Sequence, residues 1–339
     1  MAERLENEVP QKDVMELLLE LANGALGLWD VPEGATARLI NVSENATYLV
    51  ETPDGAFKSV LRVHRENYHS RRAIECEFAW TQALRDTGYV RTPNAIPGRD
   101  GNIVQTGECE GLPNPRYMVM FEFVPGEEPN EDGAEVEKHF GELGALAASL
   151  HEHAIQWQRP QPFERLVWNR DAVYGKNATW GDWRNGPNLD PSAQKVLEQV
   201  ERTVTRRLQA FGQSEQRYGL IHADMRLANL LIDGDTIWLI DFDDCGLGWF
   251  MYDFAAGISF IEDHPKIPDL REAWVEGYRS VRDLPEADER EIDSFIMLRR
   301  MALLAWISTH IDAVEAQELA PHFARVSAEL GERYLSRMT

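Results

Sequence analysis

Cysteine is scarce in this chain of 339 residues. The three cysteines, Cys76, Cys109 and Cys245, stand far apart, and no C-x-x-C occurs. A disulfide framework needs many cysteines and a zinc site needs paired ones, so the sequence indicates neither. Free thiols are typical of a reducing compartment, and we therefore expect a cytoplasmic protein.

Long apolar runs and a surplus of basic residues are also missing. The most apolar late run, 301–307, is far shorter than the roughly 20 residues that cross a bilayer, and residues 1–8 are acidic, unlike a secretory signal. The chain has 57 acidic against 34 basic residues, a net charge of −23. Such a charge repels nucleic acids and anionic membranes and favours cationic partners, although it is also typical of adaptation for solubility. We expect no nucleic-acid partner and no membrane partner.

The densest chemistry in the sequence surrounds the turn Asp-Gly-Asp at 233–235. Apolar runs flank this turn, and Gly and Asp tolerate the positive φ of a tight reversal, so we predict a hairpin. Folding the chain there brings Asn229 opposite Asp241 to within a residue or two, and Asp224 lies in the loop five residues before Asn229. Two carboxylates and an amide oxygen are ligands of the kind that hold Mg²⁺, with one acid left as a base.

The pattern H-x-D-x-x-x-x-N over 222–229, followed by D-F-x at 241–243, resembles the aminoglycoside phosphotransferase family. That family includes choline, homoserine and fructosamine kinases and a bacterial stress-response protein kinase. The resemblance implies that Asp224 is the base for the acceptor hydroxyl and that Asn229 and Asp241 bind Mg²⁺.

This segment also departs from ordinary protein kinases. Ala223 stands where those enzymes carry the Arg that reads a phosphorylated activation loop, Asp243 replaces the Gly of D-F-G, and no A-P-E follows. Gating by phosphorylation is therefore not expected. Asp243 is a further candidate metal ligand. With Asp244 it forms a pair of close carboxylates, which calls for a second Mg²⁺, a cationic acceptor or proton uptake.

Two residues support the loop in the resembling family. His222 belongs to the H-x-D pattern, and Asp253 would brace the catalytic loop by hydrogen bonds, although capping a helix would also explain an Asp there. His151 and His153 end an earlier helix. They point in divergent directions, so packing or capping is a better interpretation than a metal site.

The family fold implies an α+β, protein-kinase-like bilobal architecture. A helical extension would occupy 1–30, a small lobe with a five-stranded antiparallel sheet and a helix would occupy 31–126 and end in a hinge, and a larger, mainly helical lobe would occupy 127–339. Strand signals at 39–42, 47–51 and 59–65 predict a meander, and helical spacing predicts late helices at 270–281, 286–311 and 321–336. The resemblance implies ATP between the lobes.

A cation on the third strand should contact the nucleotide phosphates. Lys58 begins that strand, but Arg62 occupies the cation's place in the family pattern V-L-[KR]-V, and we favour Arg62. Taken alone, Arg62 could equally be a surface residue. The following helix should supply a Glu that orients this cation. The family pattern E-x-x-W favours Glu77, which leaves Glu75 on the solvated face.

The remaining nucleotide contacts follow only from the family. Ser43 and Asn45 belong to a turn that would cover the phosphates, although G-x-G-x-x-G is absent and a plain surface turn is the alternative. Glu122, Phe123 and Val124 form the expected hinge, whose backbone would bind the adenine edge. An ordinary buried strand is the alternative there.

Tryptophan is concentrated in 157–188, among Gly, Asn and Pro. Trp168, Trp180 and Trp183 need burial or a ligand. The segment is either a lid or cleft wall on the acceptor side, or an Ω-loop pinned by its aromatic residues.

These observations predict an ATP- and Mg²⁺-dependent phosphotransferase. Its acceptor would be a hydroxyl of a small, amine-bearing molecule such as an aminoglycoside, an amino sugar, an amino alcohol or a hydroxy amino acid. The alternatives are a protein Ser/Thr kinase of the stress-response type, a nucleotide-binding pseudokinase, which Arg62 in place of Lys would permit, and a metal-dependent phosphohydrolase. No feature of the sequence indicates an oligomeric state.

Overall fold

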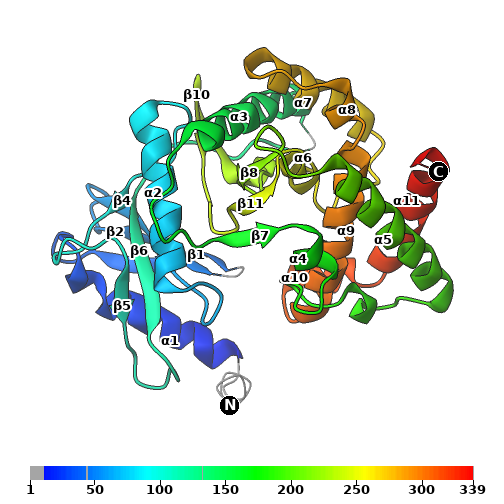
Figure 1. Ribbon diagram of the computed structural model, residues 1–339. Helices are drawn as coiled ribbons and strands as arrows, with labels where there is room; N and C mark the ends of the chain where they lie inside the picture. The colour runs from blue at the N-terminus through cyan, green and yellow to red at the C-terminus, as the bar shows by residue number, and fades with distance from the viewer. Residues whose placement is uncertain (1–10, 43–44, 132, 339) are drawn as a thin grey trace. The chain divides into compact units, whose positions relative to one another are not determined.

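The computed structural model describes residues 11–42, 45–131 and 133–338, and the chain divides into two compact units. The first unit contains the described residues up to Ala83 together with 92–125 and 159–164. The second contains 84–91, 126–158 and the chain from Arg165 onward. A single large sheet dominates the first unit and helices dominate the second (Figure 1).

The sheet of the first unit is antiparallel throughout. Its strands run in the order β1-β2-β3-β6-β4, and β5 also pairs with β6. The strands are β1 (Thr36–Val42), β2 (Ala46–Glu51), β3 (Lys58–Val63), β4 (Ala95–Ile96), β5 (Gln105–Gly107) and β6 (Arg116–Glu122). The meander β1-β2-β3 forms as predicted. The expected five strands are six, because the segment before β6 supplies two short strands, and the strand signal at 102–105 contributes only its last residue to β5.

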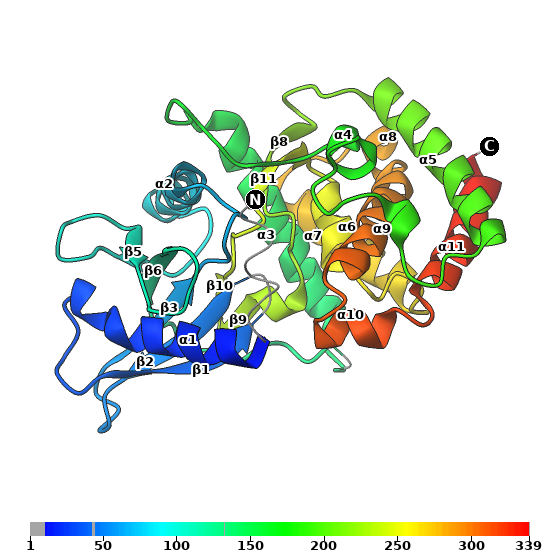
Figure 2. The same cartoon turned by 90° about the horizontal axis from the view of Figure 1, so that it is seen from below.

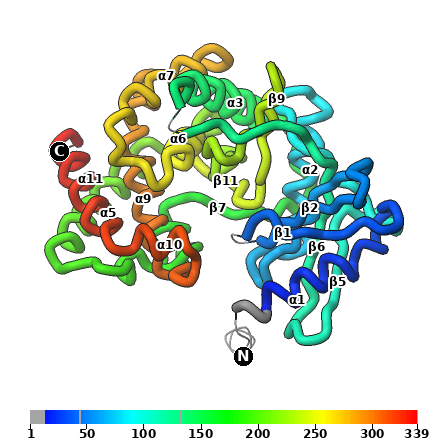
Figure 3. Tube along the Cα trace, turned by 180° about the vertical axis from the view of Figure 1, so that it is seen from behind, coloured from blue at the N-terminus to red at the C-terminus, as the bar shows by residue number. Residues whose placement is uncertain are grey.

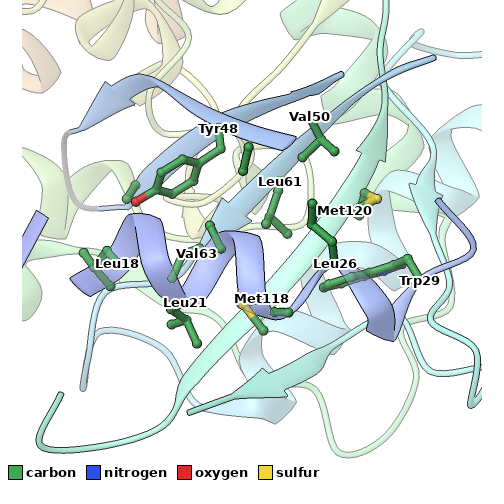
Figure 4. Close-up of a cluster of buried hydrophobic side chains, with 14 residues drawn as sticks. Leu18, Leu21, Leu26, Trp29, Tyr48, Val50, Leu61, Val63, Met118 and Met120 are labelled. Atoms are coloured by element: carbon green, nitrogen blue, oxygen red, sulfur yellow. The ribbon is translucent and has the colours of Figure 1, made fainter. Parts of the chain in front are cut away.

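Two helices cover opposite faces of this sheet. On one face, α1 (Gln11–Gly24) buries Leu18 and Leu21 against Tyr48 and Met118 (Figures 2 and 4). On the other face, Phe78 of α2 (Arg71–Thr87) packs against residues of β6. Successive residues of a strand point to opposite faces, so the two clusters divide β6 between them. The apolar side chains of α1 thus contribute to the core of the first unit.

Helices form most of the second unit. They are α3 (Val136–Gln156), α4 (Arg170–Tyr174), α5 (Pro191–Phe211), α6 (Tyr252–Gly257), α7 (Ile267–Val281), α8 (Glu286–Glu289), α9 (Ile292–Thr309), α10 (Val314–Leu319) and α11 (Phe323–Met338). The helices α3 and α7 lie side by side (Figure 3). Their backbones approach so closely that a Cβ at Gly277 would lie 1.9 Å from the carbonyl oxygen of Gly141, which explains the glycines at this contact.

Short strands position the loops of the second unit. Parallel pairing joins β7 (Leu166–Trp168) to β11 (Gly246–Trp249), and antiparallel pairing joins β11 to β8 (Tyr218–Ile221). The hairpin of β9 (Leu230–Asp233) and β10 (Thr236–Leu239) follows β8 in the chain.

The late helices differ from the prediction. The expected helix 286–311 is broken between α8 and α9, and α10 was not predicted. Two contacts hold the break: Arg217 makes a bidentate ion pair with Asp288, and Arg271 donates to the carbonyl oxygen of Glu289. These partners are distant in sequence, so helical periodicity could not reveal them. Within the described ranges, no helix is long and apolar enough to span a bilayer.

Candidate active site

The loop after β8 adopts an unusual backbone conformation. Ala223 has a φ of +66°, a region that costs an L-residue about 1–2 kcal/mol. The carboxylate of Asp253 holds this conformation, since it accepts hydrogen bonds from Ala223 N at 2.7 Å and from His222 N at 3.2 Å. The ring of His222 adds a contact of its Nε2 with Ile240 O at 3.0 Å. Neighbouring elements therefore fix the shape of the loop that carries Asp224.

Asp253 is itself held in place by a buried histidine. Its side chain is fully buried, and the Nε2 of His151 lies 3.0 Å from its Oδ2. His151 stacks on Phe250 and its Nδ1 contacts the hydroxyl of Tyr278 at 3.0 Å. Burial lowers the pKa of His151, and the neighbouring Asp253 offsets this effect only in part. A neutral His151 that donates from Nε2 suits this arrangement.

Three side chains converge on the carboxylate of Asp224. Asn229 donates its Nδ2 to the backbone oxygen of Asp224 at 2.7 Å and to Oδ2 at 2.9 Å. Arg299 and Arg226 face Oδ1, with an Nη2 at 3.2 Å and an Nε at 3.4 Å, respectively. Burial alone would raise the pKa of Asp224, but the charges of Arg226 and Arg299 outweigh it, so this pKa lies below its usual range. Asp224 is therefore ionised at neutral pH.

The two arginines have different surroundings. Arg299, from α9, is only 3% exposed, has its guanidinium carbon 5.0 Å from the ring centroid of Trp180 and 5.8 Å from that of Tyr252, and donates its Nε to Ser259 Oγ at 3.0 Å. Arg226, from the loop itself, is 28% exposed. Arg299 is a fixed part of the core, whereas Arg226 borders solvent.

The predicted hairpin brings Asn229 and Asp241 to the same end. Its turn contains Gly234 with a φ of +56°, Leu230 pairs with Leu239, and Ile240 N donates to Asn229 O at 2.9 Å. Asp241 follows Ile240 directly; it is exposed and has a φ of +58°. Because the Nδ2 of Asn229 is committed to Asp224, its Oδ1 is the atom left for a cation, and no described residue donates to it.

Asp243 lies two residues further on in a different environment. Its side chain is buried, unlike that of Asp241. Arg165 binds the backbone of this segment, with hydrogen bonds to the carbonyl oxygens of Asp243 and Cys245. Trp168 donates its Nε1 to Asp244 O at 2.7 Å. Among the described residues, no three His, Cys, Asp or Glu side chains gather as metal ligands.

The predicted cation and its Glu meet in the first unit. Arg62 of β3 is 5% exposed and places an Nη2 2.5 Å from Glu77 Oε1 of α2. The guanidinium also lies 5.2 Å from the ring centroid of Phe121. Lys58 is exposed over Phe123, and Glu75 pairs with arginines on the outer face of α2.

The other predicted nucleotide contacts lie in the same unit. The side chain of Asn45 accepts from Arg65 N at 3.0 Å, and Ser43 lies outside the described residues. Glu122 ends β6, where its N–H donates to Asn94 O at 2.9 Å; Phe123 is exposed and Val124 is half-buried.

The tryptophan-rich segment is ordered around its buried rings. Trp168, Trp180 and Trp183 are all buried, and the segment contains β7 and α4. This arrangement favours the aromatic-pinned alternative over a lid. Through Trp180, the segment also supports Arg299.

Sequence reasoning missed Arg226, Arg299, Arg165 and the role of His151 as a partner of Asp253. Arg226 stands two residues after Asp224, so its position in the motif was a usable signal. Arg299 is 75 residues from Asp224, and His151 is 102 residues from Asp253. No local pattern marks contacts at such separations.

Comparisons with known proteins identify the family of this chain. The model of the phosphotransferase enzyme family matches residues 36–290. The structure of a microcompartment-associated aminopropanol kinase is 44% identical and covers 94% of this chain and 98% of its own, with a TM-score of 0.86. An amicoumacin kinase of Bacillus subtilis (strain 168) is 24% identical over 281 residues, which is 78% of this chain and 80% of that protein.

A further solved structure shows the shared fold. The amicoumacin kinase hAmiN, in complex with AMP-PNP, Ca²⁺ and Ami, is 22% identical, covers 97% of this chain and 96% of its own, and has a TM-score of 0.73. The predicted α+β, protein-kinase-like class is confirmed. The chain belongs to the phosphotransferase enzyme family, and it is a kinase.

Proposed function

We propose that this enzyme transfers the γ-phosphate of ATP to the hydroxyl of a short amino alcohol, with Asp224 as the base that orients the hydroxyl. The relative of 44% identity is named an aminopropanol kinase, and its full-length match supports an acceptor of that size and class. The net charge of −23 also suits an acceptor that carries an ammonium group.

The proposed reaction depends on the ionised carboxylate of Asp224 and on the contacts that fix its position. An ionised carboxylate fixed by Asn229 and Arg299 can accept a hydrogen bond from the acceptor hydroxyl and aim its oxygen at phosphorus. As the new O–P bond forms and the bond from Pγ to the bridging oxygen of ADP breaks, the hydroxyl proton passes to Asp224. A carboxylate with a lowered pKa is a weak base, so orientation contributes more than early proton removal. This suits the loose transition state of phosphoryl transfer.

The donor set beside Asp224 fits a divalent cation. Asn229 offers its Oδ1, and Asp241 offers an exposed carboxylate at the same end of the hairpin. Mg²⁺ is commonly bound by one or two such side chains together with substrate phosphates, and it would neutralise charge on the β- and γ-phosphates. Asp243 is assigned to this set by its position in the motif alone.

Other residues receive supporting roles in this proposal. Arg62, oriented by Glu77, would contact the nucleotide phosphates, and its buried position favours a fixed guanidinium over a mobile one. Asp253 would keep the catalytic loop in shape through its hydrogen bonds to the backbone of His222 and Ala223.

Replacing Asp224 by Asn tests the proposal. We expect kcat with 1-amino-2-propanol to fall by about 10²–10⁴-fold while the Kd for ATP stays close to that of the wild type. Asp235→Asn, in the exposed hairpin turn, is the matched control and should leave kcat unchanged. ADP release in a coupled assay is the measurement. Undiminished turnover by Asp224→Asn would exclude this residue as the base, and wild-type turnover of aminoglycosides but of no amino alcohol would exclude the acceptor class.

A further inference from the structure

Arg226 spans two carboxylates in the second unit. Its Nε lies 3.4 Å from Asp224 Oδ1, and its Nη1 lies 3.7 Å from Glu315 Oε1 of α10. Its guanidinium carbon is 5.7 Å from the ring centroid of Phe260. A cation therefore already lies beside the proposed base, with a second carboxylate on its far side and an aromatic ring nearby.

This cation is held by charge and not by good hydrogen bonds. The Nε of Arg226 is buried and makes no hydrogen bond with any described residue, and a separation of 3.7 Å from Glu315 is too long for one. The side chain is also 28% exposed and Glu315 is 49% exposed. A ligand that donates properly to both carboxylates could replace the guanidinium with no change in the charge between them.

The two contacts of Arg226 set an upper limit on the length of such a ligand. Adjacent nitrogens of a guanidinium are about 2.3 Å apart, so Asp224 Oδ1 and Glu315 Oε1 are separated by at most about 9 Å. In an extended amino alcohol with its two groups on neighbouring carbons, the oxygen and nitrogen are about 3.7 Å apart. Adding one short hydrogen bond of about 2.7–2.9 Å at each end gives about 9 Å.

We propose that the acceptor replaces the Arg226 guanidinium, with its hydroxyl on Asp224 and its ammonium on Glu315, and that this spacing selects amino alcohols whose two groups sit on neighbouring carbons. The inference rests on the proposed function and adds the residue that recognises the amine. Phe260 contributes the face of its ring to the ammonium. Its ring packs near the rings of Trp306 and Phe323, with centroids 5.7 and 6.3 Å away, and its φ of +74° is rare for a bulky residue.

Arg299 makes this exchange possible. It is buried, bonded to Ser259 and stacked on Trp180, so it stays on Asp224 Oδ1 when Arg226 leaves. Asp224 therefore keeps Arg299 as a permanent partner, while the ammonium of the acceptor takes the place of the Arg226 guanidinium. Glu131, whose charge also acts on Arg226, adds to the attraction for a cationic acceptor.

The first test compares two glutamates of α10. Glu315→Gln should raise the KM for 1-amino-2-propanol about tenfold and leave kcat within about twofold, because the ammonium loses its charged partner while the hydroxyl and the base are untouched. Glu318→Gln removes the same charge from the exposed surface of the same helix and should change neither constant. With 1,2-propanediol, a neutral acceptor that forms no ion pair with Glu315, Glu315→Gln should not raise the KM.

The second test varies the acceptor. In the wild type, kcat/KM should be higher for ethanolamine and 1-amino-2-propanol than for 3-aminopropan-1-ol and 5-aminopentan-1-ol. In Glu315→Gln, the differences in kcat/KM among these four acceptors should become smaller. Equal effects of Glu315→Gln and Glu318→Gln, or an unchanged series in Glu315→Gln, would overturn the inference and leave the proposed function intact. Failure of the wild type to phosphorylate any of the amino alcohols would instead overturn the proposed function, and the inference with it.

Discussion

Replacing Asp253 by Asn would separate the role of this residue in stability from its role in catalysis. The carboxylate accepts from Ala223 N through Oδ1, and from His222 N and His151 Nε2 through Oδ2. An amide has only one oxygen, so in either orientation its NH₂ group faces a backbone N–H. Losing a charge-assisted hydrogen bond and burying an unsatisfied donor costs about 3–5 kcal/mol in all, which we expect as a clear decrease in Tm.

The same substitution should disturb the catalytic loop. Ala223 remains at positive φ because Asp253 binds its N–H, and the strain of about 1–2 kcal/mol is released once that bond weakens. Relaxation at Ala223 moves the neighbouring Asp224. A displacement of about 1 Å can cost about 10²-fold in rate, so kcat should fall by about 10–100-fold while the KM for ATP changes little.

The matched control is Asp288→Asn, which weakens a bidentate ion pair with Arg217 in the same unit, away from the catalytic loop. It should lower Tm and leave kcat per folded molecule unchanged. Differential scanning fluorimetry and the coupled ADP-release assay give both quantities. A variant Asp253→Asn that loses Tm but keeps wild-type kcat would refute the link between Asp253, the backbone of Ala223 and the position of Asp224.

Two further predictions concern buried charge. Burial keeps His151 neutral in the folded protein, whereas in the unfolded chain His151 takes up a proton near its usual pKa of 6.5. The contribution of His151 to stability is therefore present above that pH and is lost as the pH falls. We expect the Tm advantage of the wild type over His151→Gln to shrink between pH 8 and pH 5.5. Arg62→Met should raise the KM for ATP about tenfold or more and cost about 3–5 kcal/mol of stability, because Glu77 stays buried after losing this cation. The double variant with Glu77→Gln should recover stability but not ATP affinity, and Glu75→Gln, on the exposed face, should match the wild type in both assays.

Local rules carried the prediction of the hairpin, whereas the pairing of Arg62 with Glu77 was predicted from the patterns of the resembling family. The reversal at Gly234 depends on turn chemistry within a few residues, and strand register then fixes Asn229 near Asp241. Arg62 and Glu77 lie on a strand and on the next helix, and alternation or helical spacing alone does not say which residues of the two elements meet. The family pattern supplied that information.

Contacts between distant segments could not be predicted in this way. Arg299 lies in α9, most of whose residues are buried and apolar. A charged residue in such a helix indicates that a buried partner exists, but it does not identify that partner. The break between α8 and α9 depends on Arg217 and Arg271, which come from other elements. Both failures have one cause: a buried charge requires a partner, but the sequence does not say which segment the fold brings to it.

The charges around Asp224 connect these observations to the chemistry. Burial raises the pKa of Asp224 and the charges of Arg226 and Arg299 lower it, so Asp224 is a weak base while both arginines face it. In our proposal the two arginines act differently because they differ in exposure: Arg299, which is 3% exposed, stays beside Asp224, and Arg226, which is 28% exposed, gives up its position to a substrate of equal charge. An acceptor without a positive charge would leave that position uncompensated between Asp224 and Glu315. Selectivity for amines then follows from the electrostatics of the base itself, and not only from the fit of the acceptor to its surroundings.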